Sequence, residues 1–238
     1  MPNWCFNRID TERPLPVFTT DKDGNQTFDF NTIVPMPKSL DITSGSDMEI
    51  SIVTYLTNKF TVNVLSEATN ALIDATCNRC LLFDSHKRTI AEIIRDNKAY
   101  YDKAKKRQQS KFFKAGGIYV NNYLLYGFTD WYGWRNKYWD TKWNALDVWC
   151  DETTIEFDTP WGPPFGVVEA MSRMFPEDRI ELEWTEEAGW RGHQIYLNGE
   201  VVEELTPSDC LDDYWYDPEE ESDGESDESN ESEDSATA

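Results

Sequence analysis

The chain has 238 residues, of which 39% are hydrophobic and 28% charged, and its formal net charge is −23. No apolar run approaches the ~18 residues that a membrane span needs, and the first ten residues lack the basic-then-apolar layout of a signal peptide. We therefore expect a cytoplasmic protein with no membrane partner. The five cysteines are odd in number and irregularly spaced, which indicates a reducing compartment rather than a disulfide framework.

Charge is segregated along the chain. Residues 79–114 hold eleven Lys or Arg against four Asp or Glu, whereas residues 209–238 hold fourteen Asp or Glu and no Lys or Arg. Because the run from residue 217 on has no aromatic or branched apolar side chains to bury, we predict that residues 207–238 form a disordered acidic tail. Such a tail serves as a solvated segment, as a decoy for a basic surface, or as an intramolecular cover for residues 79–114.

Residues 1–45 are predicted to contribute strands to a sheet. Residues 3–9 (NWCFNRI) alternate as a half-buried strand does. The two alternating sets of side chains are Trp4, Phe6, Arg8 and Cys5, Asn7, Ile9. Residues 28–37 (FDFNTIVPMP) are predicted to be a second extended piece, which the prolines close.

Residues 46–143 are predicted to be a mainly helical insertion, basic at 79–114. Ser46 or Asp47 suits the N-cap of a first helix, and Ser66 that of a second. The strongest helix prediction covers residues 85–113, beginning at Ser85. Glycines 116 and 117 are expected to interrupt it before a shorter helix.

Residues 144–206 are predicted to form strand, helix, strand and strand. Residues 146–159 alternate like a strand, residues 165–175 form an amphipathic run, and residues 178–187 alternate again. Asn198-Gly199 is a hairpin signal between the last extended pieces. Together with the N-terminal strand, this order predicts an α+β fold, a sheet with helices packed on one face.

Residues 128–149 hold five of the ten tryptophans. Rings occur there on more than one helical face, as in a segment wedged between two layers. We therefore expect most of them to join the helical insertion to the sheet. The alternative is a partly open aromatic groove for a protein partner, because Trp, Tyr and Arg are enriched at interface hot spots. Its candidate contact residues are Trp134, Arg135, Trp139, Lys142 and Trp161.

The basic segment has a functional and a neutral interpretation. Its cations would neutralise phosphates, and the interleaved rings Tyr100, Tyr101, Phe112 and Phe113 would stack on bases. The candidates for contact with nucleic acid or an acidic partner are Lys103, Lys105, Lys106, Arg107, Lys111 and Lys114. A lysine-rich helix face also occurs simply for solubility, and the net charge of the chain repels a polyanion.

No motif indicates catalysis, a cofactor or a metal. The pair Cys77 and Cys80 is a lone CxxC with only His86 nearby, whereas a structural zinc needs four ligands. The chain has no phosphate-binding glycine loop, nucleophile elbow or HExxH motif. We therefore predict no catalytic residues, no metal ligands and no cofactor, and we do not expect an enzyme.

Several stretches resemble the YubB-like family of conjugative plasmids and phages. They are MPNWCFN (1–7), FDFNTIVPMP (28–37), YGFTDWYGWRNKYWDTKWNALDV (126–148), FDTPWGPPFGVVEAMSRMFP (157–176) and GWRGHQIYLNGE (189–200). The resemblance covers roughly residues 1–202 and implies a ferredoxin-like C-terminal domain without iron–sulfur chemistry. It also implies an accessory protein of a mobile element, with no established catalytic residues to carry over.

Three functions remain open at this point. The leading one is a non-enzymatic protein that binds a host protein, and its acidity suits a DNA-mimicking inhibitor of a defence or DNA-processing factor. The second is a nucleic-acid-binding accessory factor that uses residues 79–114, with the acidic tail as a cover. The third is an enzyme with an unrecognised site. The sequence does not indicate an oligomeric state.

Overall fold

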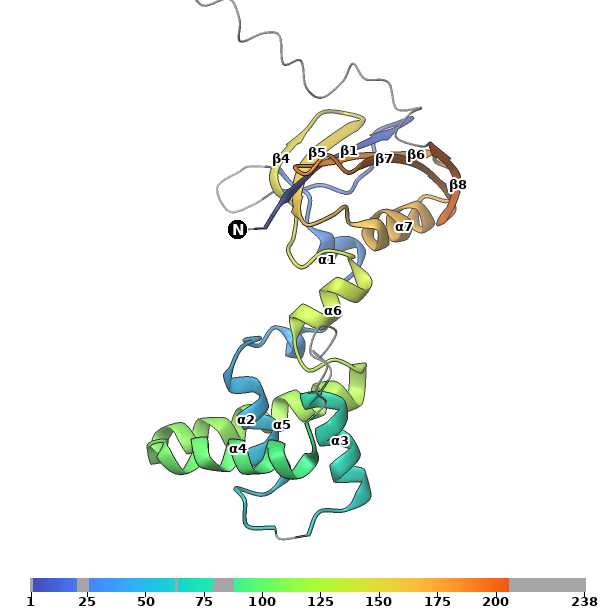
Figure 1. Ribbon diagram of the computed structural model, residues 1–238. Coiled ribbons are helices and arrows are strands. Elements are labelled where there is room, and N and C mark those ends of the chain that lie inside the picture. Colours follow the sequence, from blue (N-terminus) through green and yellow to red (C-terminus); the bar gives the residue numbers. More distant parts are fainter. Residues whose placement is uncertain (1, 21–25, 63, 79–87, 206–238) are drawn as a thin grey trace, which may run out of the picture.

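A computed structural model describes residues 2–20, 26–62, 64–78 and 88–205 (Figure 1). The chain forms a sheet part at one end and a helical part at the other, with helix α6 (Trp131–Tyr138) between them. The predicted tail, residues 207–238, lies outside the described residues.

The sheet has six strands, and every neighbouring pair is antiparallel. In chain order they are β1 (Trp4–Thr11), β4 (Leu146–Cys150), β5 (Thr154–Pro160), β6 (Ile180–Glu186), β7 (Arg191–Leu197) and β8 (Glu200–Leu205). The spatial order is β4-β5-β1-β6-β7-β8, so the predicted N-terminal strand is confirmed and lies inside the sheet. A separate two-stranded ribbon pairs β2 (Thr19–Thr20) with β3 (Gln26–Thr27).

Helix α7 (Phe165–Met174) connects β5 to β6. Both strands run antiparallel to β1, so they are parallel to each other with β1 between them, which is the split βαβ arrangement. The α+β prediction is confirmed. The alternating run 146–159, however, is a hairpin rather than one strand. The Asp151 carboxylate accepts hydrogen bonds from the Thr153 and Thr154 amides (3.0 and 2.9 Å) and turns the chain there.

Helices α1 (Phe30–Ile33) and α7 cover one face of the sheet, as predicted, and no described helix packs on the other face (Figure 1). The covered face takes the inward side chains of each strand, such as Ile9, Phe157 and Leu182, which are buried together with Val168 and Met171 of α7. Burial of these apolar side chains is the main stabilisation of this part.

The prediction of an extended piece at 28–37 is wrong. Residues 30–33 form one helical turn, because the Asp29 side chain accepts the Asn31 amide and Phe30 and Ile33 point the same way into the core. The Phe30 amide donates to the Asn144 side chain (2.8 Å), which joins this turn to the start of the C-terminal strands. A 3₁₀ turn follows at Lys38–Leu40.

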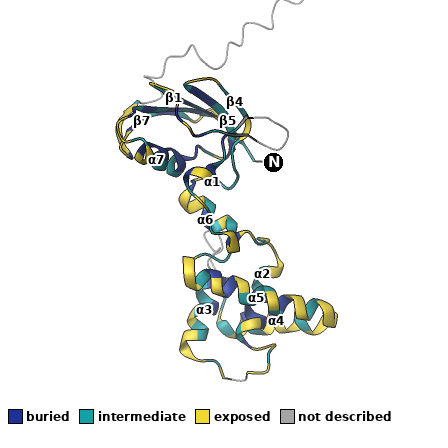
Figure 2. Ribbon diagram, turned by 180° about the vertical axis from the view of Figure 1, so that it is seen from behind, coloured by how far each residue is buried: buried dark blue, intermediate teal, exposed yellow. Residues whose placement is uncertain are grey.

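The helical part consists of α2 (Asp47–Leu56), α3 (Glu67–Cys77), α4 (Ile90–Lys103) and α5 (Lys106–Tyr126). The predicted N-caps Ser46 and Ser66 are confirmed, and the Ser66 hydroxyl accepts the Thr69 amide. Figure 2 shows that exposed residues take up much of the outer sides of α4 and α5.

The prediction of one helix over 85–113 is wrong at both ends. The described helix begins at Ile90, after a capping box between Thr89 and Glu92, and it ends at Lys103. Helix α5 then runs without a break through the two glycines. A Cβ on Gly116 would lie 2.0 Å from the Ser51 carbonyl oxygen of α2, so this glycine permits close packing of two helices rather than ending one.

Candidate functional site

Helix α6 of the tryptophan segment lies between the two parts of the molecule (Figure 1), and its buried rings pack on the sheet part. Trp134 and Trp139 are 6% and 0% exposed and belong to the same core as the sheet. The Trp139 indole donates to the Val34 carbonyl (3.0 Å) and meets the Phe30 ring edge-on at 5.5 Å. These two tryptophans therefore do not line an open groove, because their rings are buried in the core.

Arg135 lies between two rings of the same segment. Its guanidinium carbon is 5.1 Å from the centroid of Trp131 and 4.8 Å from that of Trp139. Its Nε is buried with no hydrogen-bond partner in the described residues, and burial lowers the pKa of this guanidinium. Both rings belong to α6 or its C-cap, so these cation–π contacts form within the helix and account for the arginine without a ligand.

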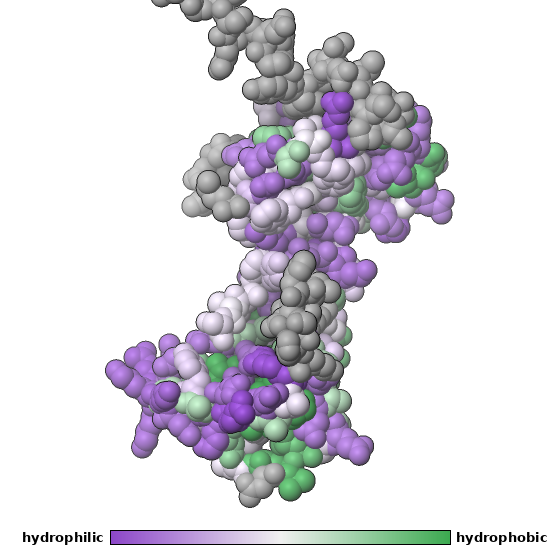
Figure 3. All heavy atoms as spheres, in the orientation of Figure 1, coloured by the Kyte–Doolittle hydropathy of each residue, from purple (hydrophilic) through white to green (hydrophobic). Residues whose placement is uncertain are grey.

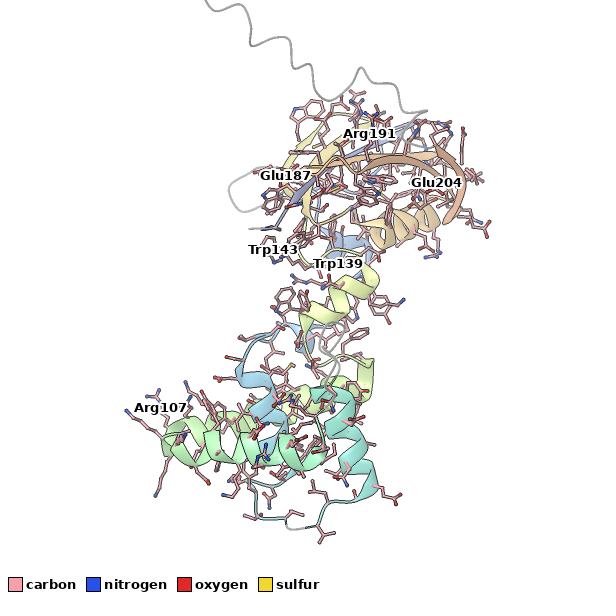
Figure 4. The ribbon with its side chains drawn as sticks, in the orientation of Figure 1. Arg107, Trp139, Trp143, Glu187, Arg191 and Glu204 are labelled. Carbon is pink, nitrogen blue, oxygen red and sulfur yellow. The ribbon has the colours of Figure 1, made fainter. Side chains whose placement is uncertain are left out.

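Lys142 and Trp161 lie together at the surface, apart from Trp134 and Trp139. The Lys142 ammonium is 4.3 Å from the ring centroid of Trp143 and 5.5 Å from that of Trp161, which is 57% exposed. Figure 4 labels Trp143 beneath the sheet and Trp139 beside α6. The five predicted contact residues are thus divided between the core, a cation–π stack and this exposed pair.

The face of the sheet on which no described helix packs, called the uncovered face below, is acidic. Along β1, β5 and β6 the outward side chains alternate with the buried ones, and the strand register aligns residues of neighbouring strands in rows. One row crosses five strands, from Trp149 through Glu156, Arg8 and Glu183 to His193. We call this surface the acidic face and define it by the partly exposed carboxylates of Asp10, Glu156, Asp158, Glu181 and Glu183.

Arg8 is the cation at the centre of the acidic face. Its Nε donates to Asp10 (2.6 Å), and its Nη1 lies 3.4 Å from Glu156. The hydrogen bond to Asp10, together with the surrounding carboxylates, raises the pKa of Arg8. At the other side of the face, the Glu181 carboxylate lies 3.4 Å from the buried His193 Nε2.

Asp158 is a carboxyl of this face whose pKa is raised. Partial burial first, and then the charges of Asp147 and Glu187, raise its pKa from 3.8 to about 6. In the strand register it lies opposite Phe6 on β1 and Leu146 on β4. Burial and the neighbouring negative charges therefore both disfavour the ionised form of Asp158. A cation placed beside this carboxyl would favour the ionised form.

Large apolar side chains are exposed on the same face. Phe6 is 44%, Leu146 40% and Trp149 54% exposed. Together with the carboxylates they make this face a mixture of exposed apolar and charged side chains, with Leu146 and Trp149 on the edge strand β4. Analysis of the sequence did not identify them as surface candidates, although the outward position of Phe6 in its alternating strand was the signal that could have found it.

The six predicted basic contact residues do cluster at the surface. All are exposed, and they lie at the α4–α5 junction and along the first half of α5. Figure 4 labels Arg107 at the outer end of this region. A surface hollow of about 700 Å³ runs between α5 and the start of α2, and Lys105, Arg107 and Lys111 border it.

The aromatic rings of the basic segment pack inward and are not arranged for base stacking. Phe112 is 2% exposed, and Phe113 meets Tyr55 with ring centroids 5.4 Å apart. Tyr101 packs on Phe60 at 5.2 Å. Of the four rings, Tyr100 is the most open, at 50% exposure.

The cysteine pair offers no reactive thiolate at its described member. Burial raises the pKa of the Cys77 thiol to about 12, and Cys80 lies outside the described residues. Burial likewise raises the pKa of Cys5 to about 12. Within the described ranges, no three His, Cys, Asp or Glu side chains gather as metal ligands would. The helices in those ranges include none with the length and apolarity to cross a membrane.

A comparison with protein families finds a match for the C-terminal part of the chain. The family model of the ferredoxin-like domain in Api92-like protein matches residues 138–235. A crystal structure of a protein api92 from Yersinia pseudotuberculosis is 14% identical, covering 86% of this chain and 98% of that chain with a TM-score of 0.36. The comparison with curated proteins found no match. The part of the chain that carries β4 to β8 and α7 is therefore similar to the ferredoxin-like domain of Api92-like proteins.

Proposed function

We propose that this chain is a non-enzymatic accessory protein of a phage or plasmid, which acts in the host cytoplasm by binding a basic host protein through its acidic face. The observation that carries the proposal is the combination of Phe6, Leu146 and Trp149 with five carboxylates on one uncovered sheet face. The YubB-like resemblance supports the mobile-element origin.

The composition of the acidic face suits a protein interface. Interfaces combine an apolar, aromatic-rich centre with a polar rim, and a few buried aromatic anchors carry most of the binding energy. Trp149 and Phe6 are available as such anchors. The carboxylates around them would speed encounter with a positively charged surface and disfavour an acidic one.

The chemistry of the partner follows from the density of negative charge. Neighbouring strands lie about 4.8 Å apart, so the carboxylates of β5, β1 and β6 form a close array. A cation from the partner near Asp158 would favour the ionised form of a carboxyl whose pKa is about 6. The array suits a protein whose own function is to bind nucleic acid, such as a defence or DNA-processing factor with a basic groove.

The test is capture of host proteins by immobilised full-length chain, comparing wild type with Phe6→Ala/Trp149→Ala and with Glu183→Lys. The control variant, Leu125→Ala, removes a 63%-exposed side chain from the helical part. We expect a basic protein that wild type and the control retain, that both sheet variants lose, and that added duplex DNA displaces. Retention of the same proteins by all variants, each verified as folded by circular dichroism, would contradict the proposal.

A further inference from the structure

The basic cluster of the helical part is not used by the proposed function. We name it the basic strip and define it as Lys103, Lys105, Lys106, Arg107, Lys111 and Lys114. We infer that the basic strip binds the phosphate backbone of nucleic acid without reading its bases. The basic strip lies on the helical part, at the other end of the molecule from the sheet that carries the acidic face (Figure 1).

The cations of the basic strip are free to meet an anion. All six are exposed, and none forms an ion pair within the described ranges. Other cations of the same helices are paired: Arg88 with Glu49, and Lys98 with Asp102 at 2.7 Å. The strip is therefore a local concentration of positive charge that neighbouring carboxylates do not neutralise.

The cations of the strip that lie at the N-terminus of α5 destabilise this helix. The N-cap of α5 is Lys105, which makes no side-chain capping bond, and the first turn contains Lys106 and Arg107 and no acid. A helix N-terminus carries partial positive charge and favours acids, as at α2, whose first turn holds Asp47 and Glu49. Cations at a helix N-terminus that has neither a capping side chain nor a nearby acid are unfavourable, and such a local conflict is expected at functional sites.

The geometry of the strip matches a row of phosphates. Arg107, Lys111 and Lys114 are spaced i, i+4 and i+7, so they lie on one face of α5 over about 10 Å of its axis. Phosphates of one DNA strand recur about every 3.4 Å along the duplex axis. Three cations on this face therefore serve about three phosphates, and the lysines at the α4–α5 junction lengthen the row.

Three of the four interleaved rings, all but the 50%-exposed Tyr100, are buried or half-buried against other side chains, which favours contacts to the phosphate backbone over contacts to bases. Phe112 is 2% exposed and Phe113 packs on Tyr55, so these side chains do not present a face to a base. Contacts to phosphate alone position nucleic acid without reading its sequence. The acidic face does not cancel this attraction, because surface charges are screened beyond about 10 Å at 0.1 M salt. Figure 3 shows hydrophilic side chains gathered at this end of the helical part.

The experiment is fluorescence anisotropy of a labelled 20-base-pair DNA duplex of mixed sequence with the full-length chain, over a series of salt concentrations. We expect the logarithm of affinity to fall linearly with the logarithm of salt concentration, with a slope of about −3 to −5. Arg107→Glu/Lys111→Glu is expected to weaken binding at least tenfold at 50 mM salt and to make the slope shallower by about two. A second duplex of different sequence should bind equally.

The matched control is Lys137→Glu, which reverses an exposed cation on α6 outside the strip. It should leave both the affinity and the slope nearly unchanged. The inference is overturned if the full-length chain does not bind the duplex at 25 mM salt, or if Lys137→Glu weakens binding as much as the double variant. Tighter binding of a synthetic peptide of residues 209–221 than of the duplex would also overturn it, because the hollow beside α5 would then be a site for an acidic peptide.

Discussion

The sheet part and the helical part bury apolar surface in different ways. The sheet part has one large continuous core, which includes residues of α1 and α7 together with Trp134 and Trp139. The described helices instead share two small clusters, each built on three buried residues. Close backbone contact between α2 and α5, at Gly116, supplements these small clusters. The helical part therefore depends on a few positions, whereas the sheet part distributes its stability over many.

The two parts also differ in how they present charge. Residues 144–205 hold fifteen Asp or Glu and three Lys or Arg, and their outward strand positions form the acidic face. The α4–α5 junction carries the basic strip. A chain with a strongly negative total charge thus offers a positive surface to a polyanion, because screening makes local charge more important than the total.

The largest expected effect is at the joint between the two parts. Trp139→Ala removes a ring that is 0% exposed and should lower the free energy of unfolding by about 3–5 kcal/mol. Thermal unfolding followed by circular dichroism measures it. The control Trp149→Ala removes a ring that is 54% exposed and should cost well under half as much. Equal losses would show that Trp139 is not enclosed in the sheet core as described.

Gly116→Val tests whether the helical part rests on its close helix contact. Its Cβ would overlap the Ser51 carbonyl oxygen, so we expect a loss of about 3 kcal/mol and separation of the two parts into distinct unfolding transitions. Calorimetry detects the second transition. Gly45→Ala is the control, because its nearest neighbour is a methyl group 3.9 Å away. An unchanged single transition for Gly116→Val would contradict the packing described for α2 and α5.

Asp158→Asn tests whether the ionised carboxylate of Asp158 destabilises the acidic face. The pKa of Asp158 is raised to about 6 in the folded chain from 3.8, so the folded state binds this proton more tightly than the unfolded state. Its contribution to stability is therefore present below about pH 4 and is lost as pH rises through about 6.

The asparagine variant should accordingly unfold at a higher temperature than wild type at pH 7, and at a similar temperature at pH 4. The gain is roughly 1 kcal/mol or less, once solvent screening of a half-exposed group is allowed for. Glu152→Gln changes another exposed carboxyl near this sheet edge and is the control. A variant that is less stable than wild type at pH 7 would show that the ionised carboxylate stabilises the face.

The smallest effect concerns the start of α5. Lys105→Ser supplies a capping hydroxyl and removes a cation from the helix N-terminus, so it should stabilise the chain by about 0.5–1 kcal/mol. The same change should weaken duplex binding about twofold to fivefold and reduce the salt slope by about one. Thr89→Ala, which removes an existing cap from α4, should destabilise by about 1 kcal/mol and leave duplex binding unchanged. A loss of stability with Lys105→Ser would show that a lysine at the N-cap does not destabilise α5.

Local patterns predicted much of this molecule. Alternation in residues 3–9 and 178–187 identified β1 and β6, the N-caps Ser46 and Ser66 were correct, and the basic residues predicted as a cluster do gather at the surface. Each of these features depends on neighbours within a few residues, or on a charge that stays in water. For the same reason, the segregation of charge could be read from the sequence alone.

Tertiary structure decided the rest, because burial depends on partners that are distant in the chain. The sequence predicted a helix break at Gly116, but in the structure this glycine allows the backbone of α2 to pack closely against α5. Trp139 and Trp161 looked equivalent as contact residues, yet the core enclosed one and left the other 57% exposed. The acidic face exists only because β1 lies between two strands about 150 residues or more away, which brings Phe6, Asp158 and Glu183 onto one surface.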